Sequence, residues 1–339
     1  LLVAIFVTEH FLRYPDGGWD ARAIWNHHAR LLARVPHRLD LVFAPEHNHA
    51  DYPLLLPGLV AHLWLASGNE TPLVPALVAA AFALLGTLAL LSSVHTLSAR
   101  WFERDALPPS VRAASVALLL WGTPIFLTQT WIQCADLPLA MLTLLAIALV
   151  LRGSIAAAGL AAGLGALTKN DGALWLAALA LVLLSTQRTS LPRFMRGALA
   201  PIAALAHLKL RLAPENDLAQ NARGEVLVRL VTLSRWWDAV KGLVREVWHV
   251  EAFGISLMAA LAISVLLARG LRTEPAIARL PRKFLTPALL AILVVYVVGA
   301  PDVDHMARNS ADRLLFQLWP TALLALALGT RLRLRADVA

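Results

Sequence analysis

Apolar residues form long runs along the whole chain, separated by short polar segments. Runs of this kind are typical of membrane helices, because a helix needs about 20 apolar residues to cross a bilayer. Several runs are shorter than that, which indicates tilted or partly embedded helices. The first run is short, so we expect its helix to have begun upstream. The pattern predicts ten spans, at residues 1–13, 72–97, 113–130, 137–151, 154–168, 172–185, 197–210, 251–268, 284–299 and 313–329.

The composition supports this interpretation. Hydrophobic residues make up 58% of the 339 residues and charged residues 15%, against about 45–50% and 25% in ordinary soluble domains. These values exclude a disordered chain, a disulfide-rich module, a coiled coil and a typical cytosolic enzyme. The single cysteine, Cys134, cannot form an internal disulfide. We therefore predict an all-α polytopic transmembrane bundle that forms one membrane domain over residues 1–339.

The basic residues predict the orientation of the bundle. They lie between apolar runs, so the net charge of +8 indicates membrane topology, and we expect no nucleic-acid partner. With a cytoplasmic N-terminus, the short inner loops hold most of them, as expected for cytoplasmic loops. These are Arg100, Arg104, Arg112, Arg152, Arg188, Arg193, Arg196, Arg269, Arg272, Arg279, Arg282, Lys283, Arg331, Arg333 and Arg335, against Lys169, Arg308 and Arg313 in the short outer loops.

This orientation requires that the apolar segment 53–68 does not cross the membrane, and we interpret it as a re-entrant or interfacial helix. Two long segments then lie outside. Segment 14–52 is the first extracytoplasmic loop and is expected to carry interfacial helices. Segment 211–250 contains an apolar stripe at helical spacing, which indicates a surface helix in the headgroup layer or one that also attracts an anionic lipid substrate. The stripe is Leu227, Leu230, Leu233, Trp237, Val240, Val244 and Trp248.

Polar motifs gather on the predicted outer face, at residues 19–20, 46–53, 129–138, 169–172 and 302–313. An active site at the membrane surface would produce this distribution. A transporter or lipid flippase, the alternative, would need polar residues across the bilayer midplane.

Two aspartates are candidate catalytic acids. Asp20 follows Gly17-Gly18-Trp19 and is either a general base for an acceptor hydroxyl or the N-cap of a helix. Asp136 precedes Leu137-Pro138 and starts a helix, where a carboxylate stabilises the positive end of the dipole. A carboxylate at membrane depth is also costly, which favours a functional role.

Lys169, Arg313, His49 and Asp51 are candidate substrate-binding residues. Lys169 either pairs with Asp171 or stabilises a leaving phosphate, and Arg313 either binds phosphate in a bidentate manner or extends to the membrane interface. His47, His49 and Asp51 alternate in sequence. They are either metal ligands or part of a solvated loop, and Asp51-Tyr52-Pro53 can also start the interfacial helix, with Pro53 in its first turn.

In order, these motifs resemble those of the GT-C membrane glycosyltransferases, which include protein O-mannosyltransferases and lipid A aminoarabinose transferases. Asp20 is followed by Ala21, whereas many members have paired acids there. The motifs are Trp19-Asp20, His49-Ala50-Asp51-Tyr52-Pro53, Ala135-Asp136-Leu137-Pro138, Leu167-Thr168-Lys169-Asn170-Asp171-Gly172 and Arg313-Leu314-Leu315-Phe316-Gln317-Leu318-Trp319-Pro320.

The resemblance implies a bacterial plasma-membrane enzyme that uses a polyprenyl-phosphate sugar donor on the extracytoplasmic face. It implies that Asp20 is the first-loop catalytic acid and Asp136 the second-loop acid. The expected reaction transfers a hexose or pentose to a hydroxyl of a glycan, lipid or protein acceptor. Lys169 and Arg313 would balance the phosphate charge. Metal dependence varies among such enzymes, so a divalent cation as cofactor stays open.

Overall fold

The computed structural model describes residues 2–101, 107–248, 252–254 and 276–329, and every regular element in these ranges is a helix. This confirms the all-α prediction. The predicted span 251–268 lies almost entirely outside the described residues. The helices of eight or more residues are α1 (Leu2–Arg13), α2 (Asn26–Arg34), α4 (Leu55–Ser67), α5 (Leu73–Trp101), α6 (Pro109–Trp121), α7 (Pro124–Trp131), α8 (Asp136–Leu151), α9 (Ile155–Thr168), α10 (Asn170–Thr186), α11 (Leu191–Arg211), α14 (Leu233–Val247), α16 (Leu280–Gly299) and α17 (Val303–Gly329).

Shorter helices lie in the segments predicted to be outside. The first of these segments holds a π-helical turn (Ala21–Trp25) and α3 (Leu39–Val42), and the second holds α12 (Asp217–Asn221) and α13 (Val226–Val231). Single 3-10 turns occupy Arg188–Ser190 and Ala276–Arg279. The first outer segment therefore carries helices as predicted.

Three stretches of the described residues are long and apolar enough to cross a membrane, namely α5, Ile277–Gly299 and α17. The helices α6 and α7 would make a fourth span if they count as one, but they meet at an angle of 69°. Pro124 begins α7 and causes this break, because its ring excludes the α conformation at the preceding residue. A membrane bundle agrees with these helices, while the predicted ten crossings stay a prediction.

The centre of the bundle is α8, a 16-residue helix buried over almost its whole surface. It packs against α5, α9 and α17. At about 1.5 Å per residue its length is about 24 Å, less than the roughly 30 Å hydrocarbon core. Its neighbours α9 and α10 are also short, with 14 and 17 residues, and the buried Asp136 and Lys169 lie at the starts of α8 and α10.

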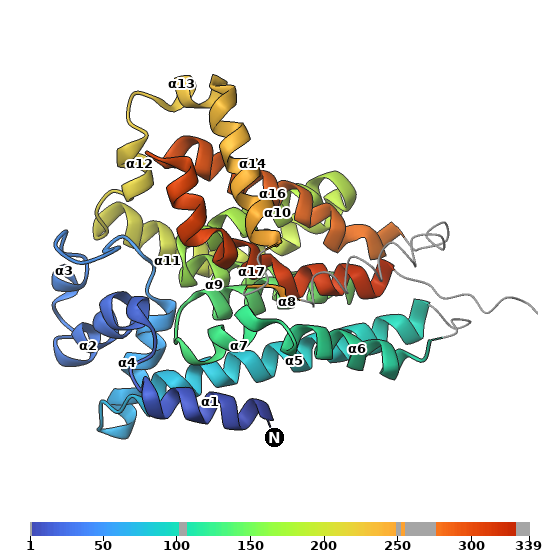
Figure 1. The fold of residues 1–339 in the computed structure, drawn as a ribbon, viewed down its shortest axis with the longest axis horizontal. Coiled ribbons are helices and arrows are strands. Elements are labelled where there is room, and N and C mark those ends of the chain that lie inside the picture. Colours follow the sequence, from blue (N-terminus) through green and yellow to red (C-terminus); the bar gives the residue numbers. More distant parts are fainter. Residues whose placement is uncertain (1, 102–106, 249–251, 255–275, 330–339) are drawn as a thin grey trace, which may run out of the picture.

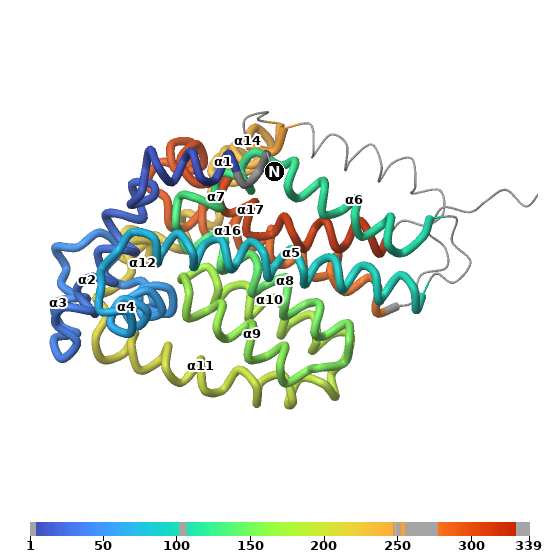
Figure 2. The backbone as a smooth tube through the Cα atoms, turned by 90° about the horizontal axis from the view of Figure 1, so that it is seen from below, coloured from blue at the N-terminus to red at the C-terminus, as the bar shows by residue number. Residues whose placement is uncertain are grey.

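One end of the molecule gathers the short elements. Both views place α2, α3, α4 and α12 at this end, away from the far ends of α5 and α6 (Figures 1 and 2). The segment 53–68 forms α4, which packs against α2. This helix begins at Leu55, two residues after Pro53, so the prediction that Pro53 lies in its first turn is wrong.

The predicted amphipathic stripe forms on α13 and α14, and its apolar side chains point outward except for Leu230, which packs against the core. Leu233 is 82% exposed and Trp237 63% exposed. The arginines point inward: Arg229 Nη1 donates to Val298 O and Arg235 Nε to Val297 O, each at 2.7 Å. In Figure 1, α14 runs across the direction of α5 and α6. An outward apolar face on a helix across the bundle is the geometry of an interfacial helix.

Candidate functional site

Asp20 is positioned by a close backbone contact between the first outer segment and the loop before α8. Gly18 N donates to Ile132 O at 3.0 Å. Gly17 has a φ of 74°, and a Cβ there would lie 2.7 Å from Ile132 O. The motifs at 17–20 and 129–138 meet at this contact, and only glycine at position 17 fits both its conformation and the space.

Asp20 forms an ion pair with Arg313 of α17, across 293 residues of sequence. We call these two residues the exchange pair. Both side chains are partly exposed, Arg313 by 30% and Asp20 by 25%. Asp20 stands at the start of the π-helical turn but makes no side-chain capping bond, so the alternative interpretation as a helix cap is wrong.

A second group of charges is buried inside the bundle. Lys169 Nζ lies 2.8 Å from Asp136 Oδ1 and 3.1 Å from Asp171 Oδ2. Gln317 Nε2 donates to the same two oxygens, at 2.6 and 3.1 Å. We call Asp136, Lys169, Asp171 and Gln317 the buried cluster. Lys169 therefore pairs with Asp171, one of the two predicted roles, and also with Asp136.

The backbone around Lys169 explains this geometry. Lys169 is the single extended residue between α9 and α10, which aims its side chain at the start of α8. Asp136 and Asp171 both lie in the first turn of their helices, where the helix dipole favours a carboxylate. A Cβ on Gly172 would lie 2.0 Å from Gly165 O, so glycine is required where α10 turns back along α9.

Asp51 lies apart from the other acids and is 3% exposed. Its Oδ2 accepts hydrogen bonds from Asn170 at 2.7 Å, Asn216 at 2.8 Å and Lys209 at 3.0 Å. Burial alone would raise the pKa of Asp51, but the hydrogen bonds from Asn216, Lys209 and Asn170 and the charge of Lys209 hold it below its usual range. Asp51 ties the first outer segment to α10, α11 and the residue before α12.

The histidines of the first outer segment do not converge with Asp51. His49 stacks on Tyr52, with ring centroids 4.6 Å apart, while His47 Nδ1 lies 3.3 Å from His27 Nε2. Burial lowers the pKa of His28 to about 4, helped by the neighbouring histidines. Within the described ranges, no group of three or more His, Cys, Asp or Glu residues is placed to hold a metal ion, so the structure does not support the metal-ligand interpretation of His47, His49 and Asp51.

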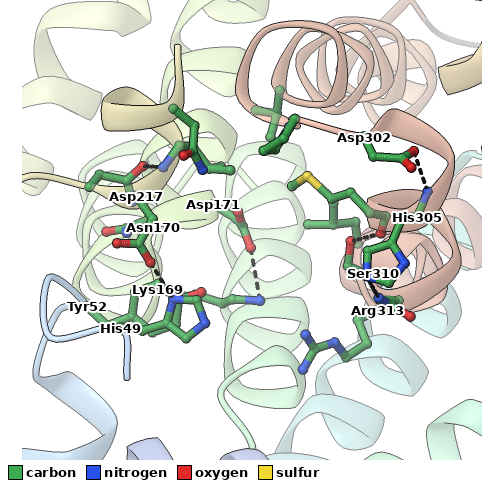
Figure 3. Close-up of a pocket in the computed structure, with 18 residues that line it drawn as sticks. His49, Tyr52, Lys169, Asn170, Asp171, Asp217, Asp302, His305, Ser310 and Arg313 are labelled. Atoms are coloured by element: carbon green, nitrogen blue, oxygen red, sulfur yellow. Dashed lines mark hydrogen bonds and ion pairs between the residues drawn. The ribbon is translucent and has the colours of Figure 1, made fainter. Parts of the chain in front are cut away.

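A cavity of about 460 Å³ separates the two groups of charges. Figure 3 shows His49, Lys169 and Asp171 on one wall and His305, Ser310 and Arg313 on the other. Asp20 and Asp136 do not line the cavity but stand directly behind Arg313 and Lys169, to which they are bonded. Each of the two predicted acids is thus separated from the cavity by the cation to which it is bonded.

A second cavity of about 680 Å³ shares Asn170, Asp171, Asn216, Leu218 and Val295 with the first. Its further lining is mostly apolar and comes from α10, α12, α13, α16 and the loops beside α12, together with the charged residues Lys209 and Glu215. The apolar side chains among these residues are Leu174, Ala219, Ala222, Val226, Val294 and Val298. A polar cavity thus continues into an apolar one.

Two pairs of predicted site residues are in contact, Asp20 with Arg313 and Asp136 with Lys169. His49 and Lys169 line the same cavity. Sequence reasoning missed Gln317, Lys209 and Asn216. Gln317 lies on α17 four residues after Arg313, one helical turn away, and this spacing could have indicated it. Lys209 and Asn216 carry no such signal, because Lys209 lies near the end of an apolar helix and Asn216 in a loop.

In comparisons with known proteins, no family model, curated protein or solved structure matches this chain.

Proposed function

We propose that this protein is a membrane glycosyltransferase that moves a sugar from a polyprenyl-phosphate donor to an acceptor hydroxyl on the extracytoplasmic face. The observation that carries the proposal is the cavity between the exchange pair and the buried cluster. It offers one partly exposed arginine for a phosphate and, directly behind it, a carboxylate able to accept a proton. Arginine is well suited to phosphate, which it binds in a bidentate manner.

The adjoining apolar cavity supports a lipid-linked donor. A sugar phosphate needs polar partners, while a polyprenyl chain needs apolar surface removed from water. Here the polar lining around Asp171 and Asn216 passes into the apolar lining of α12, α13 and α16. The outward apolar face of α14, with Trp237 and Trp248 exposed, supports contact of this end of the bundle with the bilayer surface.

In the proposed reaction the acceptor oxygen attacks the anomeric carbon of the sugar. A new carbon–oxygen bond forms, the bond from that carbon to the phosphate oxygen breaks, and polyprenyl phosphate leaves with the electron pair. Asp20 takes the acceptor's proton, and Arg313 stabilises the negative charge of the leaving phosphate. Asp136 holds Lys169 in place through their ion pair. Neither residue takes part in the bond changes.

The experiment that tests this function is the incubation of purified protein with polyprenyl-phosphate sugars and a mixture of membrane glycans and lipids. We expect free polyprenyl phosphate to appear for at least one donor. Asp20→Asn should lower turnover by about 10²-fold or more, the usual scale for a general base.

The matched control is Asp40→Asn, because Asp40 is an exposed acid of the same outer segment that pairs with Arg38. Its turnover should equal that of the wild type. No release from any donor, or full turnover in Asp20→Asn, would refute the proposed chemistry. Movement of an intact lipid-linked sugar across vesicles, without cleavage, would favour a flippase.

A further inference from the structure

The two cations that line the cavity differ in how firmly they are held. Lys169 has a side chain only 9% exposed and pairs with two carboxylates, Asp136 and Asp171. Arg313 has a side chain 30% exposed and pairs with Asp20 alone among the described carboxylates. Moving Lys169 breaks two ion pairs, of which the one with Asp136 is fully buried, whereas moving Arg313 breaks a single pair that water already reaches.

Arg313 also has an unused donor. Its Nε is buried and has no hydrogen-bond partner among the described residues. An unpaired buried donor costs free energy, so the guanidinium is not fully satisfied by Asp20. The Nε and Nη2 of an arginine together form the edge that binds two oxygens of a phosphate, and Asp20 is bonded to Nη1 and does not use this edge.

From these observations we infer that the phosphate of the donor takes Arg313 away from Asp20, so that donor binding frees the catalytic base. This inference rests on the proposed function and adds an order of events to it. Without donor, Arg313 occupies Asp20 and keeps it from an acceptor hydroxyl. With donor, the guanidinium turns to the phosphate and Asp20 becomes available for the acceptor.

The exchange makes Asp20 a competitor of the phosphate for Arg313. Removing the negative charge of Asp20 should therefore strengthen donor binding while it abolishes turnover. An ion pair that only holds the fold together predicts the opposite, since a loosened site binds its ligand less well. Competition at one arginine also makes the two residues non-additive.

The test is the affinity of purified protein for polyprenyl phosphate, measured on the wild type, Asp20→Asn, Arg313→Gln and the double variant. We expect Asp20→Asn to bind about tenfold more tightly, within the usual range of coupling between sites. Arg313→Gln should bind at least about tenfold more weakly, and the double variant should equal Arg313→Gln. Asp40→Asn, which changes the same charge at the same end of the chain, should bind like the wild type.

The outcomes separate the two proposals. Equal or weaker binding in Asp20→Asn, with weaker binding in Arg313→Gln, overturns the exchange and leaves the phosphate contact standing. Unchanged binding in Arg313→Gln overturns both the exchange and the contact. A wild type that neither binds polyprenyl phosphate nor releases it from donors refutes the proposed function itself. Should Asp20→Asn not fold, Asp20→Ser removes the same charge and decides the question.

Discussion

The buried cluster and the exchange pair each join a cation to a carboxylate from a distant part of the chain, yet their surroundings differ. In the buried cluster, Lys169 and Asp136 are 9% and 2% exposed, Asp171 is 19% exposed, and Gln317 donates a hydrogen bond to each aspartate. In the exchange pair, Arg313 and Asp20 are 30% and 25% exposed, and Arg313 Nε has no described partner. The ion pair at the centre of the buried cluster is closed to water. The exchange pair is partly open to water and leaves one hydrogen-bond donor without a described partner.

This difference indicates which group serves the fold and which serves a ligand. Breaking a buried ion pair leaves an uncompensated charge in a medium of low dielectric, whereas an exposed pair contributes about 0–1 kcal/mol. The buried cluster therefore stabilises the bundle and fixes one wall of the cavity. The exchange pair costs little to rearrange, as a ligand-binding group requires.

The largest effect is expected for Lys169→Met, which leaves the buried Asp136 and the partly exposed Asp171 without a cation. The free energy of unfolding should fall by about 3–5 kcal/mol, measured as thermal or denaturant stability in detergent. Adding Asp136→Asn returns the net charge of the cluster to its original value, so the double variant should recover much of the loss. A loss below about 1 kcal/mol in Lys169→Met would contradict the structural role of the cluster.

A smaller effect is expected for Asp51→Asn, which tests whether Asp51 stabilises the fold as the buried cluster does. Three donors converge on its Oδ2, and asparagine keeps one oxygen acceptor but removes the negative charge that pairs with Lys209. The free energy of unfolding should fall by about 1–3 kcal/mol at neutral pH. Asp40→Asn, at an exposed pair, should leave stability unchanged.

The effect of Asp51→Asn should also depend on pH. The pKa of Asp51 is held below its usual range in the folded state, so its charge stabilises the fold above the unfolded pKa of about 3.9. This contribution is lost as the pH falls through the folded pKa. The difference in stability between wild type and variant should therefore shrink from about pH 5 downward, and a constant difference would contradict the assignment.

The sequence was sufficient for the helical class and for most helix positions, because apolar runs and proline breaks are local signals. It indicated residues from three of the segments that meet at the cavity, but none from segment 216–221 or from α16. The helix that contains the predicted span 313–329 is longer than that span, since α17 starts at Val303. Asp302 precedes α17, and Asp304, His305 and Arg308 lie in its first turns. A hydropathy pattern does not detect a helical segment that is this polar.

The partners of each site residue could not be predicted. Whether Lys169 meets a phosphate or two carboxylates depends on how α8, α9 and α10 pack, and residue types alone leave both outcomes open. Likewise, the pairing of Asp20 with Arg313 joins residues 293 positions apart. A pattern shows which side chains are costly to bury, while only the packing shows how each is compensated.

The most direct test of the central claim compares polyprenyl-phosphate affinity in Arg313→Gln and in the charge-restored variant Lys169→Met/Asp136→Asn. Both remove a cation that lines the cavity, and Arg34→Gln, at the exposed Arg34–Glu70 pair, controls for the loss of a surface charge. The account predicts affinity lowered by about tenfold or more in Arg313→Gln and close to wild type in the other two. Wild-type affinity in Arg313→Gln, with lost affinity in Lys169→Met/Asp136→Asn, would contradict it.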